Sequence, residues 1–136
     1  MKKLFAIFAA LLLSGNIFAH EGHDHDGPVK VQAPKGGMIK MLDDSYLEVV
    51  NKGKTFNIYL YDKDLKPIDA KTFAITAKVQ KPRGKTMEDV KLEAKDLNLE
   101  GSFDAKGIHR YTLILNVKSP KEEHADMVKF TIEPKK

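Results

Sequence analysis

The sequence contains no cysteine and no tryptophan. Without cysteine there can be no disulfide framework, no thiolate metal site and no lipoprotein anchor attached through a thiol. Long apolar runs are also missing: the run over residues 4–13 is about ten residues long, whereas a membrane-spanning helix needs roughly twenty. We therefore expect a soluble mature protein without a permanent membrane anchor.

The first 19 residues have the pattern of a cleavable signal peptide. Lys2 and Lys3 provide a positive start, residues 4–13 are apolar, and residues 14–19 include the small residues Ser14, Gly15 and Ala19. An uncleaved anchor is the alternative, but the apolar run is too short for it. The pattern predicts cleavage after Ala19 and a periplasmic location.

Net charge gives no strong indication of a partner. Removing Lys2 and Lys3 from the 23 basic residues leaves 21, against 19 acidic residues. Nucleic acids and anionic membranes are bound by concentrated basic patches, and this balance favours neither partner. We expect no membrane insertion after cleavage. The remaining 117 of the 136 residues suffice for one domain with a hydrophobic core.

Residues 20–28 have no large apolar side chain that could anchor them to a core. We expect them to form a flexible, histidine-rich tail ahead of a single domain over residues 29–136.

The domain has a hydrophobic period of two, which is typical of strands with one buried face. The apolar alternating sets are Phe56, Ile58 and Leu60; Phe73, Ile75, Ala77 and Val79; Val90, Leu92 and Ala94; Leu97, Leu99 and Phe103; Leu113, Leu115 and Val117; and Val128, Phe130 and Ile132. Turn residues separate the sets, and no segment has a helical apolar stripe. The pattern predicts an all-β, immunoglobulin-like antiparallel sandwich of about seven or eight strands.

The tail carries three of the five histidines within six residues, each followed or preceded by a carboxylate. Neutral imidazole is a good ligand for zinc and copper, and carboxylates can complete the coordination shell. The predicted metal ligands are His20, Glu21, His23, Asp24, His25 and Asp26. The alternative is a solvated polar tail that only keeps the terminus soluble.

Cleavage after Ala19 would make His20 the first residue of the mature chain. Its free amine and its ring could then bind one copper ion together, as in a histidine brace. The alternative is that a cleavage site precedes a histidine by coincidence.

The other candidate ligands are less specific. His109 shares strand parity with Tyr111 and Leu113, which predicts a packed histidine facing the core. His124 is expected in an exposed turn, from which it could approach the tail. Met38 and Met41 offer thioethers for copper(I), but three residues apart in a strand they point to opposite faces. We expect core packing for at least one of them.

Several motifs resemble a known family. They are the histidine-rich start, Pro34-Lys35-Gly36-Gly37, Tyr46-Leu47-Glu48-Val49-Val50, Ile58-Tyr59-Leu60-Tyr61-Asp62 and Lys66-Pro67-Ile68. Together they resemble a small periplasmic β-domain that accompanies cobalt-zinc-cadmium and copper efflux systems, alone or at the front of their adaptor proteins. The resemblance covers about the first half of the mature chain. This sequence has Lys35 where the family often has histidine before the paired glycines.

The resemblance implies periplasmic metal handling through the tail histidines. The leading hypothesis is a scavenger or carrier that binds copper or zinc as cargo and delivers it to an efflux adaptor. The alternative is an envelope interaction module that binds another protein through a sheet edge or through Tyr59 and Tyr61. No nucleophile with a neighbouring base and no catalytic carboxylate pair stands out, so we do not expect an enzyme.

Overall fold

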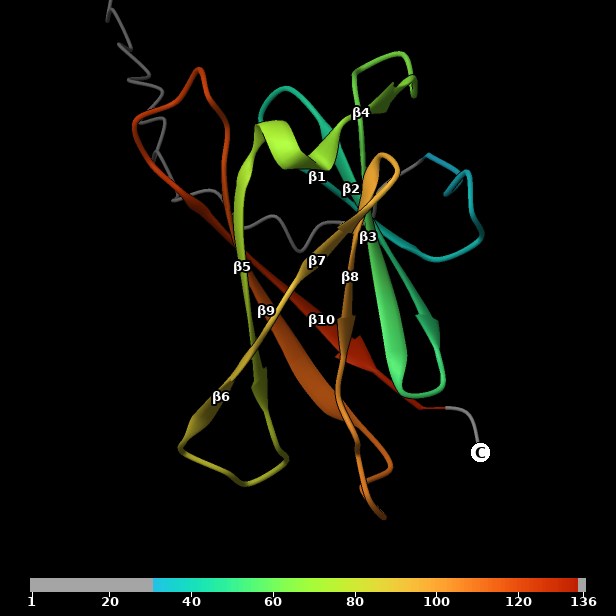
Figure 1. The fold of residues 1–136 in the computed structure, drawn as a ribbon, viewed down its shortest axis with the longest axis vertical. Helices are drawn as coiled ribbons and strands as arrows, with labels where there is room; N and C mark the ends of the chain where they lie inside the picture. Colours follow the sequence, from blue (N-terminus) through green and yellow to red (C-terminus); the bar gives the residue numbers. More distant parts are fainter. Residues whose placement is uncertain (1–30, 135–136) are drawn as a thin grey trace, which may run out of the picture.

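The computed structural model describes residues 31–134, which form ten β-strands and one short 3-10 helix (Figure 1). The strands are β1 (Met38–Met41), β2 (Tyr46–Lys52), β3 (Thr55–Tyr61), β4 (Pro67–Ile68), β5 (Ala74–Gln80), β6 (Met87–Val90), β7 (Glu93–Lys95), β8 (Asn98–Ser102), β9 (Tyr111–Lys118) and β10 (Asp126–Ile132). The 3-10 helix η1 (Ala70–Thr72) lies between β4 and β5. No helix of residues 31–134 is both long enough and apolar enough to cross a membrane.

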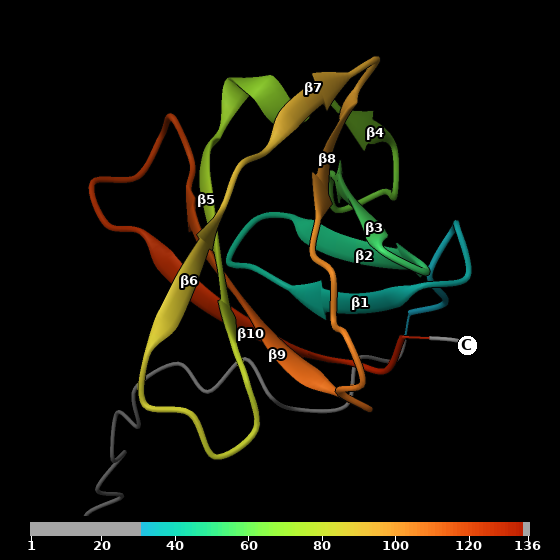
Figure 2. The same cartoon turned by 60° about the horizontal axis from the view of Figure 1, so that its bottom comes forward.

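The strands form two antiparallel sheets, as Figure 2 shows from a second direction. The first sheet has the order β1-β2-β3-β8-β7. The short strand β4 also belongs to it and pairs with Leu60 and Tyr61 at the end of β3. The second sheet has the order β10-β9-β5-β6. The predicted all-β class with two antiparallel sheets is therefore confirmed.

The prediction of seven or eight strands was too low. Val90, Leu92 and Ala94 belong to no single strand: β6 ends at Val90 in the second sheet, and β7 begins at Glu93 in the first. Residues between the two strands cross from one sheet to the other. Ala94 is consequently exposed, and Leu97, in the β7–β8 turn, is 50% exposed although its parity predicted burial.

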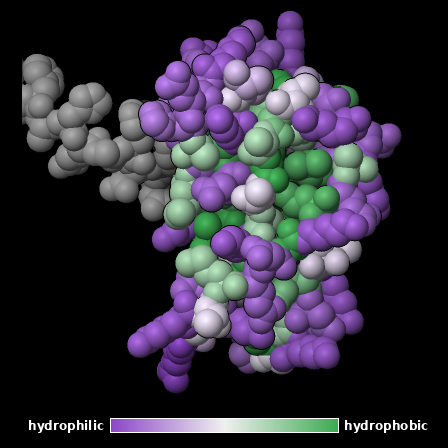
Figure 3. Space-filling model, turned by 60° about the vertical axis from the view of Figure 1, so that its left-hand side comes forward, coloured by the Kyte–Doolittle hydropathy of each residue, from purple (hydrophilic) through white to green (hydrophobic). Residues whose placement is uncertain are grey.

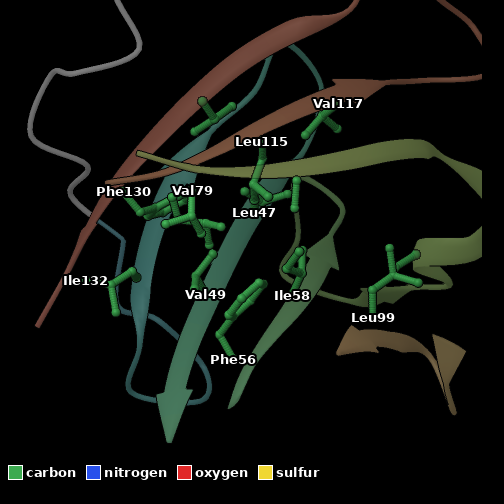
Figure 4. Close-up of a cluster of buried hydrophobic side chains, with 14 of the residues drawn as sticks. Leu47, Val49, Phe56, Ile58, Val79, Leu99, Leu115, Val117, Phe130 and Ile132 are labelled. Carbon is green, nitrogen blue, oxygen red and sulfur yellow. The ribbon is translucent and has the colours of Figure 1, made fainter. Parts of the chain in front are cut away.

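The core lies between the two sheets. Each sheet contributes the side chains on its inner face, which are every second residue along a strand (Figure 4). Phe56 and Ile58 of β3 are fully buried and face Leu115 of β9, among other residues. Close packing here requires a glycine in β8: a Cβ atom on Gly101 would lie 2.5 Å from Cζ of Phe56. Burial of these apolar surfaces is the main stabilising contribution.

The connections between strands gather at two ends of the molecule (Figure 1). We call the upper end the connections β1–β2 (42–45), β3–β4 (62–66), β4–β5 (69–73), β7–β8 (96–97) and β9–β10 (119–125). We call the lower end the connections β2–β3 (53–54), β5–β6 (81–86) and β8–β9 (103–110). The registers support this division, because Ser102 at the end of β8 pairs with Thr55 at the start of β3.

Candidate functional site

The predicted tail ligands lie outside the residues that the structure describes. His20, Glu21, His23, Asp24, His25 and Asp26 all precede residue 31. Their metal-binding role therefore remains a prediction from the sequence.

The two remaining histidines lie at opposite ends of the molecule. His109 was predicted to face the core, and this is wrong: it is exposed in the β8–β9 connection, and β9 begins only at Tyr111. Strand parity therefore does not apply to it. His124 is exposed in the β9–β10 connection at the upper end, as predicted. The two histidines cannot join one site.

The methionine pair of β1 also differs from the prediction. Met38 pairs with Val49 of the core face and Met41 with Tyr46 of the outer face, so the two thioethers point to opposite faces as expected. Neither packs in the core, however: Met38 is 36% exposed and Met41 is 52% exposed. The reason is that β1 is an edge strand, so its side chains are covered by a strand on one side only.

Three carboxylates meet at the upper end of the fold. Asp43 comes from the β1–β2 connection, Glu122 from the β9–β10 connection and Asp126 from the start of β10, and their ligand oxygens all lie within 4.8 Å of one another. Burial raises the pKa of Glu122 above its usual value, and the negative charges of Asp126, Asp43 and Asp44 add to the effect. A hollow of about 270 Å³ adjoins this acidic cluster.

The acidic cluster was not predicted. Its members come from connections almost eighty residues apart, so no local spacing in the sequence could indicate it. Three carboxylates without a nitrogen or sulfur ligand suit hard cations such as calcium or magnesium better than copper or zinc. The cluster therefore does not replace the predicted histidine site.

A buried carboxylate holds the first described residues against the outer face of the first sheet. Glu48 of β2 is fully buried. Its Oε1 and Oε2 each accept a hydrogen bond of 3.1 Å from the backbone N–H of Lys35, and Oε2 accepts one of 2.8 Å from that of Gly37. The hydroxyl of Tyr61 donates a bond of 2.8 Å to Oε1. With three donors, the buried carboxylate is well solvated by the protein itself.

The paired glycines are required by this arrangement. Gly36 has a φ of +73°, a conformation that favours glycine. At Gly37 a Cβ atom would lie 2.3 Å from the backbone oxygen of Val49, so a larger residue would force this segment away from the sheet. The glycines of the family-like motif thus bring two backbone N–H groups to Glu48.

Lys35 and the two tyrosines of β3 have structural roles at the same place. The ammonium group of Lys35 lies 5.4 Å from the ring centroid of Tyr59, a cation–π contact. Tyr61 was expected on an exposed outer face as part of a docking surface, and this is wrong. It is only 2% exposed, because its hydroxyl is bonded to Glu48 beneath the segment that contains Lys35.

Tyr61 should make stability depend on pH in the alkaline range. Burial and the hydrogen bond to Glu48 raise the pKa of the Tyr61 hydroxyl well above its usual value. The unfolded chain releases this proton near pH 10 while the folded chain keeps it, so the stabilisation is complete below pH 10 and falls above it. We expect Tyr61→Phe to cost about 1.5–3 kcal/mol at pH 7. The difference from wild type should shrink by about 1.4 kcal/mol per pH unit above pH 10.

Urea unfolding at several pH values measures the free energies of unfolding of wild type and Tyr61→Phe, and Tyr111 provides the control. It is 2% exposed and its hydroxyl has no hydrogen-bond partner among the described residues. Because the buried hydroxyl has no bond to lose, Tyr111→Phe should leave the free energy of unfolding at pH 7 unchanged or raise it. Equal losses in both variants at pH 7 would show that the bond to Glu48 contributes nothing.

Comparison of the chain with protein-family models, with curated proteins and with solved structures found no match.

Proposed function

We propose that the protein is an exported, periplasmic metal-binding protein that carries or scavenges copper or zinc through His20, His23 and His25. Glu21, Asp24 and Asp26 complete the coordination. The observation that carries this proposal is the density of ligands: three imidazoles alternate with three carboxylates in residues 20–26. The ion is cargo, and no catalytic step is assigned to it.

The fold suits a carrier because the segment after the tail is fixed to it. Glu48 binds the backbone of Lys35 and Gly37, only ten residues beyond His25. A ligand-bearing segment is thus attached to a stable body of two sheets, for which we propose the immunoglobulin-like type. The resemblance to β-domains of efflux systems supports delivery of the ion to an efflux adaptor.

Calorimetric titration of the mature protein with copper(II) and zinc(II) tests this function. The variant His20→Ala/His23→Ala/His25→Ala should lose at least about a hundredfold in affinity, because two or more imidazole ligands are removed. The matched control is His109→Ala/His124→Ala, which removes two exposed imidazoles elsewhere and should leave the affinity unchanged. Equal affinities in all three proteins would refute tail-mediated binding.

Deletion of residues 20–27 separates this function from the alternative one. A carrier should lose its metal while keeping its melting temperature, because residues 20–27 offer no large apolar side chain and the core of the described residues runs from Leu42 to Ile132. An envelope interaction module, whose sandwich binds another protein, should keep its partner after the same deletion.

A further inference from the structure

The fold separates the charges of the chain between its two ends. The three connections of the lower end carry six lysines and arginines and one carboxylate, Asp104, and Glu133 after β10 adds a second carboxylate at this end. The upper end carries eight carboxylates and four lysines. Figure 3 shows hydrophilic side chains at both ends of one face, with apolar surface between them. A nearly balanced sequence therefore folds into a molecule with a basic end and an acidic end.

Most bases of the lower end are available to a partner. Lys54 pairs with Asp104 at 3.5 Å and Lys81 with Glu88 at 2.8 Å. The other four are exposed and form no salt bridge with any residue of 31–134; they are Arg83, Lys85, Lys106 and Arg110. Exposed, unpaired cations at one end create a positive potential that attracts anions over about 10 Å.

The position of these bases suits a flat partner. Arg83 and Lys85 belong to the β5–β6 hairpin of the second sheet, whereas Lys54 belongs to the β2–β3 turn of the first (Figure 1). Lys54 and Lys106 line a hollow of about 340 Å³, but Arg83 and Lys85 lie outside it. A peptide in the hollow would miss the hairpin. The four unpaired bases belong to the β5–β6 and β8–β9 connections, which extend furthest at this end in Figure 1, so a broad surface can contact them together.

We propose that the lower end is a docking surface for the phosphate groups of an anionic lipid membrane. The acidic upper end is repelled by the same surface, so the charge separation also orients the molecule. Met87, at the lower end beside the hairpin turn, is 50% exposed and can enter the interfacial layer of the lipid. Binding is peripheral and reversible, and it requires neither the tail nor a metal.

Vesicle co-sedimentation with a chelator present tests the docking surface without involving the metal site. The mature protein should bind vesicles of phosphatidylcholine and phosphatidylglycerol and not vesicles of phosphatidylcholine alone. Binding should be lost between about 50 mM and 500 mM salt, because the Debye length falls from more than 10 Å to a few ångström.

Neutralising the unpaired bases should weaken this binding strongly. Each lysine or arginine near an anionic surface contributes roughly fivefold to the binding constant. The variant Arg83→Gln/Lys85→Gln/Lys106→Gln/Arg110→Gln should therefore bind at least about a hundredfold more weakly. Its melting temperature should be unchanged, because these exposed side chains make no salt bridge within residues 31–134.

The matched control removes the same charge from the other end. The variant Lys63→Gln/Lys66→Gln/Lys71→Gln/Lys121→Gln should lose far less affinity for the anionic vesicles, because these charges lie at the end away from the membrane and are screened by salt. Equal weakening in both variants would show attraction by net charge alone and would overturn the proposal. Absence of wild-type binding to anionic vesicles would also overturn it, and binding to polyglutamate instead would assign the lower end to an acidic protein segment.

Discussion

Glu48→Ala is expected to lower the free energy of unfolding by about 3–5 kcal/mol, which corresponds to a fall of at least about 10 °C in melting temperature. The variant removes the acceptor of three donors, the N–H groups of Lys35 and Gly37 and the hydroxyl of Tyr61. A buried donor that loses its acceptor costs about 1–3 kcal/mol. The missing side chain also leaves a cavity where Glu48 was fully buried.

Glu93→Ala is the matched control for this stability measurement. Glu93 belongs to the same sheet, but its carboxylate is 67% exposed and lies 3.9 Å from the ammonium group of Lys91. Such exposed pairs contribute less than about 1 kcal/mol. A loss in Glu48→Ala no larger than that in Glu93→Ala would contradict the role of Glu48.

Glu48→Gln separates hydrogen bonding from packing. Glutamine fills the same space and keeps one acceptor oxygen, but its amide NH₂ opposes donors that previously faced an oxygen. We expect a loss about half as large as that of alanine. Amide hydrogen exchange should be faster at Lys35 and Gly37 in both variants, because these N–H groups depend directly on the carboxylate.

The strands were predictable because each has one face in the core. Period two correctly identified the alternating core residues of β3, β9 and β10, although Asn57, Tyr61 and Ile114 are buried as well, and turn residues indicated the connections between the strands. The crossing from β6 to β7 was not predictable, because the alternation of Val90, Leu92 and Ala94 continues through a change of sheet. Alternation of apolar and polar residues indicates which face of a strand is buried. It does not indicate which sheet the strand belongs to.

The outer face of the first sheet shows a second limit of the pattern. Glu48 and Tyr61 have the parity of solvent-facing residues, yet both are buried because the segment containing Gly36 and Gly37 folds over them. The only signal in the sequence was the pair of glycines, whose conformational freedom permits that close approach. A polar residue on an outer strand face can thus be buried by chain that precedes the strand.

The candidate sites at the ends could not be derived from spacing at all. The acidic cluster and the basic lower end each combine connections that are distant in the sequence. Which turns share an end depends on strand order and direction, and these follow from the fold. The histidines of residues 20–25 are the opposite case, because their proximity in the sequence is sufficient to suggest a shared ion.

Metal affinity should fall steeply between pH 7.5 and pH 5 if the tail histidines bind the ion. Imidazole must be neutral to coordinate, and with an ordinary histidine pKa of about 6.5 the neutral fraction falls about thirtyfold over this range. Two bound imidazoles therefore predict a fall of about a thousandfold, and three predict more than ten-thousandfold. Titration calorimetry with zinc(II) at several pH values measures this slope and so counts the bound histidines.

The alternative to a metal site in the tail is a site in the acidic cluster. The same zinc titrations at several pH values distinguish the two sites. A site made only of Asp43, Glu122 and Asp126 has no imidazole to protonate, so its affinity should fall less steeply over the same range, with some loss towards pH 5 because the pKa of Glu122 is raised. Asp43→Asn/Glu122→Gln should leave a steep, histidine-dependent profile unchanged. A shallow profile that survives alanine at His20, His23 and His25 but disappears in Asp43→Asn/Glu122→Gln would move the metal site from the tail to the upper end.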